Sequence, residues 1–327
     1  MVVKEKKRVL PFVIKCIAVP AAAMGIIYLL NIPYQKIDDE KYMDLWNLRM
    51  LGNQIPEDEI DFANIGSSHG AYNFDYTALE ELGNTCFNFG NASQTYTYDL
   101  ALLKEYGKYL DDECVLFIPV SYFSFNNETV NDTEAQALSV KYYHCLSPQN
   151  IPDYDLYTDI VTTRLPILSA GEDILKLCPN LNLTLTAQAA EGDDNSINVE
   201  EFADRARQRY ERHFAGKEEY FLPKRIEELY AIIKYCRENS VTPVLITTPF
   251  SQYYNELVPE DFLQEFYATI NKISSDTGVS YYDYSHDERF QYNLEYFSDS
   301  DHLSDAGKQY FMGVLQDEVT ELQEALR

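Results

Sequence analysis

Two short stretches decide the fold and the candidate chemistry of this chain: NIGSSHG at residues 64–70 and FSDSDHLS at residues 297–304. The first places serines and glycines directly after an apolar run, and the second holds Asp299 and His302 three residues apart. A serine hydroxyl becomes a good nucleophile only when a base takes its proton and a third group orients that base. The two stretches therefore contain the residue types of a nucleophilic site, with Ser68 as the nucleophile.

Apolar runs and helical patterns alternate along the rest of the chain. Five runs have the length and apolar content of buried strands: residues 60–65, 85–89, 114–120, 242–248 and 279–284. Helical spacing of apolar residues follows at 226–233 and 262–273, and Ser304 is placed to cap a last helix. The inner face of that helix is expected to comprise Tyr310, Phe311, Val314, Leu315 and Leu322. Strands that alternate with helices indicate a three-layer α/β/α sandwich around a parallel, flavodoxin-like sheet of about five strands.

One long stretch, roughly residues 124–222, interrupts this alternation. It contains a helical patch at residues 200–213 and is predicted to be a mostly helical insertion. In open α/β folds the ligand cleft lies at the carboxyl ends of the strands. We therefore expect the insertion to pack over that end of the sheet and to shape access to the site.

The N-terminus has the pattern of a membrane anchor. Basic side chains within residues 1–8 precede an apolar stretch, 9–30, whose length suits a bilayer core of roughly 30 Å. Because positive flanks stay in the cytoplasm, residues 1–8 are expected to be a cytoplasmic tail, with 31–59 a stalk and 60–327 an extracellular domain held at the cell membrane. A cleavable signal peptide is the alternative, since residues 21–23 are three alanines.

The charge of the chain changes sign after the anchor. The first 31 residues carry +4, and the net charge of −27 then leaves −31 on the remainder. Such acidity disfavours nucleic acid and anionic lipid as partners. Five of the six cysteines lie beyond the anchor and form no CxxC pair, so free buried thiols, with one disulfide as the alternative, are expected rather than a metal site. No cofactor and no metal are predicted.

The two stretches leave alternatives for individual residues. Gly66 lets the chain turn sharply after the first strand, so that Ser68 begins the next helix and its own N–H can stabilise an oxyanion. The alternative role of Ser68 is to cap that helix. Asp299 is placed to orient His302, and Asp301 is the second candidate, because adjacent residues point in opposite directions.

Two further residues belong to the predicted cleft. His69 follows the nucleophile and is expected either to contact substrate at the cleft rim or to be a plain surface residue. Pro249 follows the fourth predicted strand and is expected to line the cleft.

In these blocks the sequence resembles the SGNH (GDSL-like) hydrolase family over residues 60–327, apart from the insertion. The Gly-Asp-Ser block of that family reads Gly-Ser-Ser here, with Ser68 in the nucleophile's place. The family's second block supplies a glycine whose N–H joins the oxyanion hole, and Gly90 fits it. The final Asp-x-x-His block is matched by Asp299 and His302.

One block of the family is missing. Where the family has Gly-x-Asn-Asp, residues 119–123 read Pro-Val-Ser-Tyr-Phe. The resemblance then leaves Ser121 or the side chain of Asn91 as the substitute oxyanion donor. The Gly-Ser-Ser turn and the N-terminal anchor resemble the DltD-like group in particular, which, like the alginate-acetylation proteins, consists of membrane-anchored relatives that modify cell-surface polymers.

The resemblance implies a membrane-anchored extracellular serine esterase or O-acyltransferase. Its substrates would be acyl esters (for example acetyl) of cell-envelope or extracellular polysaccharide, with Ser68, His302 and Asp299 as the catalytic triad. The implied partners are that acylated polymer and a membrane acyltransferase. The alternative, favoured by the missing block, is a non-catalytic surface protein with the same fold that binds a glycan or an acyl-transfer partner.

Overall fold

The structure, a computed structural model, describes residues 2–46, 55–56, 59–126, 139–177, 199–216 and 219–327. Its centre is a five-stranded parallel sheet with the strand order β2-β1-β3-β4-β5. The strands are β1 (Ile60–Asn64), β2 (Cys86–Asn88), β3 (Leu110–Pro119), β4 (Thr242–Thr247) and β5 (Ser280–Asp283). Each of the five predicted runs overlaps one of these strands, which confirms the predicted α/β fold with a parallel sheet.

The helices lie between and around these strands. The α-helices are α1 (Val2–Trp46), α2 (Ser68–Tyr72), α3 (Thr77–Glu81), α4 (Tyr96–Tyr106), α6 (Leu156–Asp159), α7 (Val199–Phe214), α8 (Pro223–Glu238), α9 (Gln252–Asn255), α10 (Glu260–Thr277), α11 (Glu288–Gln291), α12 (Asp305–Glu318) and α13 (Thr320–Ala325). Shorter helical turns are η1 (Gly107–Tyr109), η2 (Lys141–His144), η3 (Ile160–Arg164), η4 (Pro166–Ser169), η5 (Gly171–Leu177) and η6 (Leu294–Tyr296).

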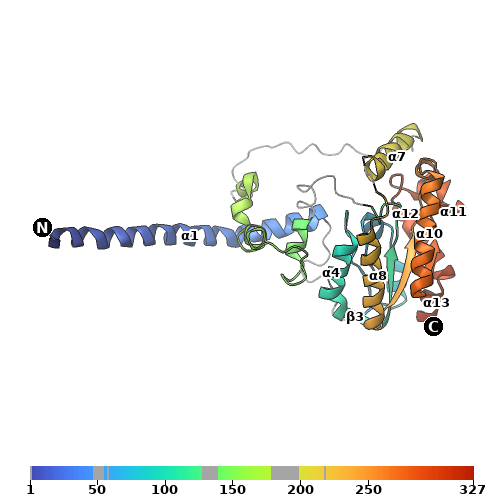
Figure 1. The fold of residues 1–327 in the computed structure, drawn as a ribbon, viewed down its shortest axis with the longest axis horizontal. Helices are drawn as coiled ribbons and strands as arrows, with labels where there is room; N and C mark the ends of the chain where they lie inside the picture. Colours follow the sequence, from blue (N-terminus) through green and yellow to red (C-terminus); the bar gives the residue numbers. More distant parts are fainter. Residues whose placement is uncertain (1, 47–54, 57–58, 127–138, 178–198, 217–218) are drawn as a thin grey trace.

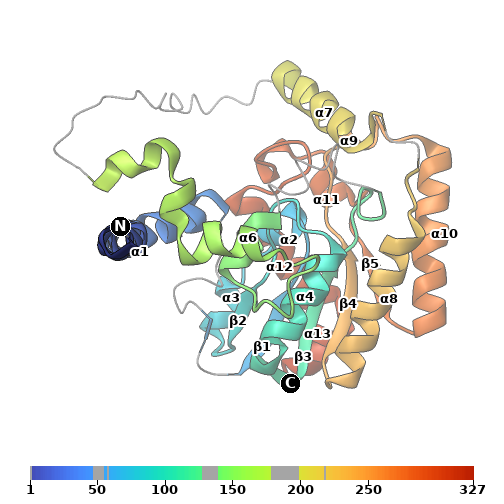
Figure 2. The same cartoon turned by 60° about the vertical axis from the view of Figure 1, so that its left-hand side comes forward.

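The sheet is buried on both faces because its strands alternate apolar side chains between two helical layers. On β3, Leu116 and Ile118 pack with α4, α8 and α10, whereas Val115 and Phe117 pack with α3, α12 and α13. In Figure 2, α4 and α8 lie in front of the strands and the red helices α12 and α13 lie behind them. This explains why the strand is apolar throughout rather than alternating with polar residues.

The last helix differs from its prediction. Ser304 caps α12 as expected, accepting a hydrogen bond from the Gly307 N–H at 3.2 Å. The chain leaves the helical conformation at Val319, so Leu322 reaches the core from a separate helix, α13. Tyr310 is 42% exposed and stacks on Tyr296, so its predicted place on the inner face is wrong.

Helix α1 is longer than the predicted anchor. It continues to Trp46, so the predicted stalk begins as helix, and of the rest of that stalk only residues 55, 56 and 59 are described. Residues Phe12–Lys41 are long and apolar enough to cross a membrane. Figure 1 shows the N-terminal half of α1 projecting away from the rest of the molecule. Burial begins at Asn31 and Tyr34, close to the predicted end of the span.

The predicted insertion divides into two parts with different neighbours. The first described part, residues 139–177, packs beside α1, where the Asn31 side chain donates to the Arg164 carbonyl at 2.9 Å. The second part, α7, contacts α9 near the carboxyl ends of the strands. Among the described residues, the insertion covers that end of the sheet through α7 and through Lys141, which contacts Asn91 and Ala92 after β2. Its first part also packs on the polar half of α1.

Candidate active site

The serine lies on a turn that buried polar groups hold in place. Gly66 has φ +112°, a left-handed conformation that favours glycine, and its N–H donates to Asp99 Oδ1 at 2.8 Å. The Gln94 side chain donates to the same oxygen at 2.7 Å. Ser68 then opens α2 and is 8% exposed. The sharp turn predicted after the first strand is confirmed.

The aspartate and histidine lie on a tight loop that fixes both side chains. Ser298 N–H donates to the His302 carbonyl at 2.9 Å, which closes the loop. Asp299 Oδ1 accepts backbone N–H bonds from Asp301 at 3.0 Å and from His302 at 2.9 Å. Its other oxygen lies 2.7 Å from His302 Nδ1. A carboxylate bound in this way orients the ring and makes Nε2 the ring atom that can accept a proton.

Direct bonds join the two stretches, although 230 residues separate them. Asn73, at the end of α2, accepts the Leu303 N–H at 2.9 Å and donates to Thr248 Oγ1 at 2.9 Å. Ser251, after β4, donates its hydroxyl to the Ser300 carbonyl at 2.7 Å. The serine turn and the Asp-His loop are therefore held at the same edge of the sheet, as strand order alone predicts.

Arg209, on α7, lies between the predicted nucleophile and the predicted base. Its Nη2 is 2.9 Å from His302 Nε2 and 3.5 Å from Ser68 Oγ. Its Nε lies 3.1 Å from both carboxylate oxygens of Asp301. Burial lowers the pKa of Arg209, but the charges of Asp301 and Asp299 outweigh burial and raise that pKa above its ordinary value. Arg209 is therefore a fixed positive charge at the centre of the site.

Sequence reasoning missed Arg209, but a signal for it existed. The buried residues Phe202, Ala206 and His213 mark the inner face of α7, and Arg209 falls on the same face at helical spacing. An arginine on the buried face of an otherwise polar helix indicates a buried anionic partner. Arg205, by contrast, makes an exposed pair one turn along its own helix.

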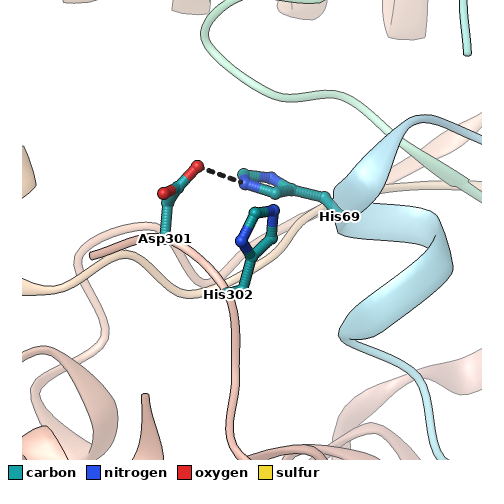
Figure 3. Close-up of side chains that lie close together, drawn as sticks. All are labelled: His69, Asp301 and His302. Atoms are coloured by element: carbon teal, nitrogen blue, oxygen red, sulfur yellow. Dashed lines mark hydrogen bonds and ion pairs between the residues drawn. The ribbon is translucent and has the colours of Figure 1, made fainter. Parts of the chain in front are cut away.

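His69 belongs to a second, interior group and does not lie at the cleft rim or on the surface. It is fully buried, with Nε2 3.2 Å from Asp301 Oδ2 and Nδ1 2.7 Å from Ser121 Oγ. Figure 3 shows His69, Asp301 and His302 pointing toward one another. Both predicted environments of His69 are wrong, because α2 turns this side chain toward Phe123 and Phe250, whose rings meet it edge-on.

The charges of this interior group are set by its surroundings. Burial lowers the pKa of His69 despite the opposing effect of Asp301, so the ring is neutral. Burial alone would raise the pKa of Asp301, but His302, His69 and Arg209 outweigh it and hold that pKa well below its usual range. Asp301 is therefore a buried carboxylate, and Arg209 is its counter-ion.

The loss of that counter-ion should destabilise the fold. The Arg209→Ala variant leaves the Asp301 carboxylate buried without its cation, so we expect the free energy of unfolding to fall by about 3–5 kcal/mol. Urea unfolding of the detergent-solubilised protein measures this. The control is Arg205→Ala, whose exposed ion pair should change stability by about 0.5 kcal/mol or less.

A double variant separates this effect from simple loss of packing. Arg209→Ala combined with Asp301→Ala should lose less stability than the sum of the two single variants, since neither charge is then left alone. Additive losses would show that the two charges do not stabilise each other.

Gly90 does not supply an oxyanion donor in this geometry. Its N–H donates to Asn88 Oδ1 at 2.8 Å, so the predicted role of that N–H is wrong here. The glycine is needed for another reason, because a Cβ at this position would lie 2.6 Å from Ala71 N and 2.6 Å from the Gly70 carbonyl carbon. The absence of a side chain lets the chain after β2 pack directly on α2.

The interior also contains the two predicted substitute oxyanion donors, Asn91 and Ser121, and the second predicted cleft residue, Pro249. Asn91 is buried, and its side-chain oxygen accepts from the Lys141 ammonium at 2.5 Å. The Ser121 hydroxyl is engaged with His69. Pro249 is buried and is not among the residues that line the cavity beside His302. The structure therefore brings Ser68, His302 and Asp299 together, whereas Asn91, Ser121 and Pro249 lie behind them.

A cavity of about 670 Å³ opens beside the Asp-His loop. Tyr72 from α2 and Lys308 from α12 line it together with Asp299 and His302. Asp301, His69 and Ser121 are buried and do not line this cavity. A ligand in this cavity would therefore meet the side of the site that holds His302.

Three side chains of the site, from His69, Asp301 and His302, lie close enough together to hold a metal ion. One ligand atom each from His69, Asp301 and His302 lies within 4.8 Å of the others. However, the Arg209 guanidinium already contacts both Asp301 oxygens and His302 Nε2. A metal cation there would lie against a fixed positive charge, so the arrangement favours an anion at this position instead.

Comparison with protein-family models agrees with the Asp-x-x-His block of the sequence. The family model described as DltD protein matches residues 183–308, a segment that includes Arg209, Asp299 and His302. No curated protein is significantly similar to the chain.

Two solved structures are similar to the chain at low identity. One is an acetyl xylan esterase, AlAXEase, with 14% identity, a TM-score of 0.36, and coverage of 79% of this chain and 99% of that chain. The other is a GDSL-like lipase, itself unconfirmed, from Parabacteroides merdae ATCC 43184, with 13% identity, a TM-score of 0.37, and coverage of 83% and 99%. Likenesses at this level carry no argument about activity. The DltD match covers residues 183–308, less than half of the chain, and the sheet order with the Ser and Asp-x-x-His blocks is similar to that of the SGNH (GDSL-like) type.

Proposed function

We propose that this protein is a membrane-anchored extracellular serine esterase or O-acyltransferase. The observation that carries the proposal is the 2.7 Å contact between Asp299 Oδ2 and His302 Nδ1, with His302 Nε2 and Ser68 Oγ both reaching one nitrogen of Arg209. Asp299 holds the proton on Nδ1, which makes Nε2 the basic atom. The Ser68 hydroxyl, 3.5 Å from the Arg209 nitrogen that lies 2.9 Å from Nε2, is the group whose proton this base would take.

The reaction follows from these roles. Ser68 Oγ attacks the ester carbonyl carbon while His302 Nε2 takes the hydroxyl proton, and a tetrahedral oxyanion forms. His302 then gives that proton to the departing alcohol oxygen, which leaves an acyl ester on Ser68. In the second half, His302 takes a proton from water or a polymer hydroxyl, whose oxygen attacks the acyl carbon. The bond from that carbon to Ser68 Oγ then breaks, and His302 returns the proton to Oγ. Hydrolysis and acyl transfer differ only in this acceptor.

Arg209 has two roles in the proposal. Since its Nη2 donates to His302 Nε2, the guanidinium must leave that atom before the base can accept the serine proton. An oxyanion on a carbon bound to Ser68 Oγ would form close to the same nitrogen, so the guanidinium can transfer its hydrogen bond to that oxyanion. Together with the Ser68 N–H, this would replace the donor that Gly90 does not supply.

The substrate and the location are inferred from the family and the anchor. DltD-like proteins, as the sequence resemblance implies, modify cell-surface polymers, so acyl esters (for example acetyl) of a cell-envelope or extracellular polysaccharide are the proposed substrates. A membrane acyltransferase is the proposed partner that supplies or receives the acyl group. The excess of basic residues before the apolar run of α1 favours a cytoplasmic N-terminus and an extracellular catalytic domain.

The non-catalytic alternative also has an observation in its favour. Arg209 occupies the basic atom of His302, and the Gly90 N–H is already bound to Asn88. A surface protein that only binds a glycan or an acyl-transfer partner could keep both contacts permanently. The two functions differ in whether Ser68 ever becomes a nucleophile.

Substitution of Asp299 tests the enzyme proposal. Asp299→Asn removes the charge that holds the tautomer of His302, so we expect turnover of p-nitrophenyl acetate by the full-length protein to fall about 10⁴-fold. Asp276→Asn is the matched control, since Asp276 pairs with the exposed Lys272 and is not among the residues that line the cavity beside His302. Equal turnover by wild type and the Asp299 variant would favour the non-catalytic alternative.

A further inference from the structure

Exposed apolar side chains gather on the first part of the insertion. Outside α1, ten large hydrophobic residues of the described structure are exposed, and five of them fall within residues 156–177. We call these five the insertion apolar patch: Leu156, Tyr157, Leu168, Ile174 and Leu175. Scattered exposed hydrophobic residues are ordinary, but a concentration of them marks a surface that something apolar covers.

The insertion apolar patch lies on a segment that is fixed to α1. The Ile167 N–H donates to the Asn31 side chain at 3.2 Å, and Asn31 in turn donates to the Arg164 carbonyl at 2.9 Å. Further along, the Lys41 ammonium lies 2.7 Å from Asp173. In Figure 1 this light-green segment lies beside α1 where the projecting half of the helix begins. The segment is therefore fixed to α1 at two points, Asn31 and Lys41, which lie about 15 Å apart along the helix.

The level of Asn31 on α1 coincides with the predicted edge of the bilayer core. Residues 12–30 of α1 are apolar except for Lys15 and mostly exposed, and at 1.5 Å per residue they extend about 28 Å. This nearly equals a hydrocarbon core of roughly 30 Å, so Asn31 falls at its boundary. A segment bonded to Asn31 lies in the headgroup region if α1 spans the membrane.

The composition of the segment suits that region. Tyrosine is enriched at membrane interfaces, and interfacial elements combine apolar side chains with basic ones that extend toward the headgroups. Tyr157 is 73% exposed, and the side chains of Arg164 and Lys176 are also largely exposed. The bilayer is favoured over a protein as the occupant because α1 already places the patch against it.

We propose that residues 156–177 form a membrane-contacting surface, whose apolar patch inserts into the headgroup region of the bilayer that α1 crosses. The inference rests on the proposed membrane anchor but not on the proposed chemistry. The contact would give the extracellular domain a second point of attachment besides α1. It would thereby fix the height and tilt of the active site above the membrane, so that only polymer at that height reaches the site.

Three matched substitutions test the proposal in the full-length protein. The Tyr157→Trp variant reports the patch, and Tyr28→Trp reports the apolar span of α1. Tyr292→Trp reports the loop after α11, an element on the side of the domain away from the projecting half of α1 (Figure 1). All three tyrosines are exposed, and each variant is made in a Trp46→Phe background, because Trp46 is the chain's one tryptophan.

Each variant is placed in phosphatidylcholine vesicles with and without brominated acyl chains, which quench tryptophan within contact. We expect brominated lipid to cause strong loss of emission for Tyr28→Trp and Tyr157→Trp but none for Tyr292→Trp. Quenching of Tyr28→Trp without quenching of Tyr157→Trp would overturn the proposal while leaving the anchor intact, and would mean that the patch faces water, another protein or a second copy. Quenching of none of the three would overturn the anchor and the proposal together.

Discussion

The Ser68→Ala variant should lose esterase turnover almost completely. Without Oγ the protein has no nucleophile, and removal of the serine from such a triad costs about 10⁵-fold or more in kcat. The measurement is the rate of p-nitrophenyl acetate hydrolysis by full-length protein in detergent. Binding of substrate should persist, since Ser68 is not among the residues that line the cavity beside His302.

Ser67→Ala is the matched control for that variant. Ser67 is the neighbouring serine, and its side chain makes no capping bond to α2 in the described structure. We expect its turnover to stay within a few-fold of wild type. If both variants lost activity equally, the loss would reflect damage to the turn rather than to the nucleophile.

The His302→Ala variant should show a loss of similar size. The base and the nucleophile act as a unit, so removal of His302 also costs about 10⁵-fold or more, and the Ser68→Ala/His302→Ala double variant should lose no more than either single one. Turnover of p-nitrophenyl acetate measures all three. If the fold-loss of turnover in the double variant equalled the product of the two single losses, Ser68 and His302 would not act in the same step.

Two substitutions of other histidines act as controls. His286→Ala removes an exposed ring whose bonds are to Tyr122 and Ser285, so its turnover should be unchanged. His69→Ala should lower stability because it deprives buried Asp301 of a partner. If His69→Ala abolished turnover in a fully folded protein while His302→Ala did not, the base would be assigned wrongly.

Much of the fold could be predicted because its signals are local. The runs at β1, β2, β4 and the second half of β3 are largely buried on both faces, and a strand with no exposed face has a continuous apolar sequence. The run at β5, on the edge of the sheet, is only partly buried. Asp299 and His302 could be paired from sequence because three residues on one tight loop determine their contact. Gly66 could be recognised because a sharp turn after a strand requires a backbone conformation that few other residues adopt.

The rest depended on contacts between distant segments. Arg209 reaches the site from an insertion helix, and no spacing relates it to Ser68 or His302. The direction of the Gly90 N–H is decided by the Asn88 side chain, and the burial of His69 is decided by the aromatic rings around it. The sequence within each block therefore identified the residue types, whereas their partners depended on packing.

The chain contains a second Ser-His-Asp group that competes with the proposed triad. His69 joins this group, because its Nδ1 lies 2.7 Å from Ser121 Oγ and its Nε2 lies 3.2 Å from Asp301 Oδ2. All three are 2% exposed or less, so among the described residues Ser121 is covered where an ester would have to reach it. Ser68 is less buried and His302 lines a cavity, which is why the proposal assigns the chemistry to them.

The central claim is that Ser68 is the nucleophile, and the most direct test is to locate a covalent adduct. Full-length protein is treated with a fluorophosphonate, digested, and analysed by tandem mass spectrometry. The account predicts one modified residue, Ser68, with labelling lost in the His302→Ala variant. Modification of Ser121 instead, or no modification of a correctly folded protein, would contradict it.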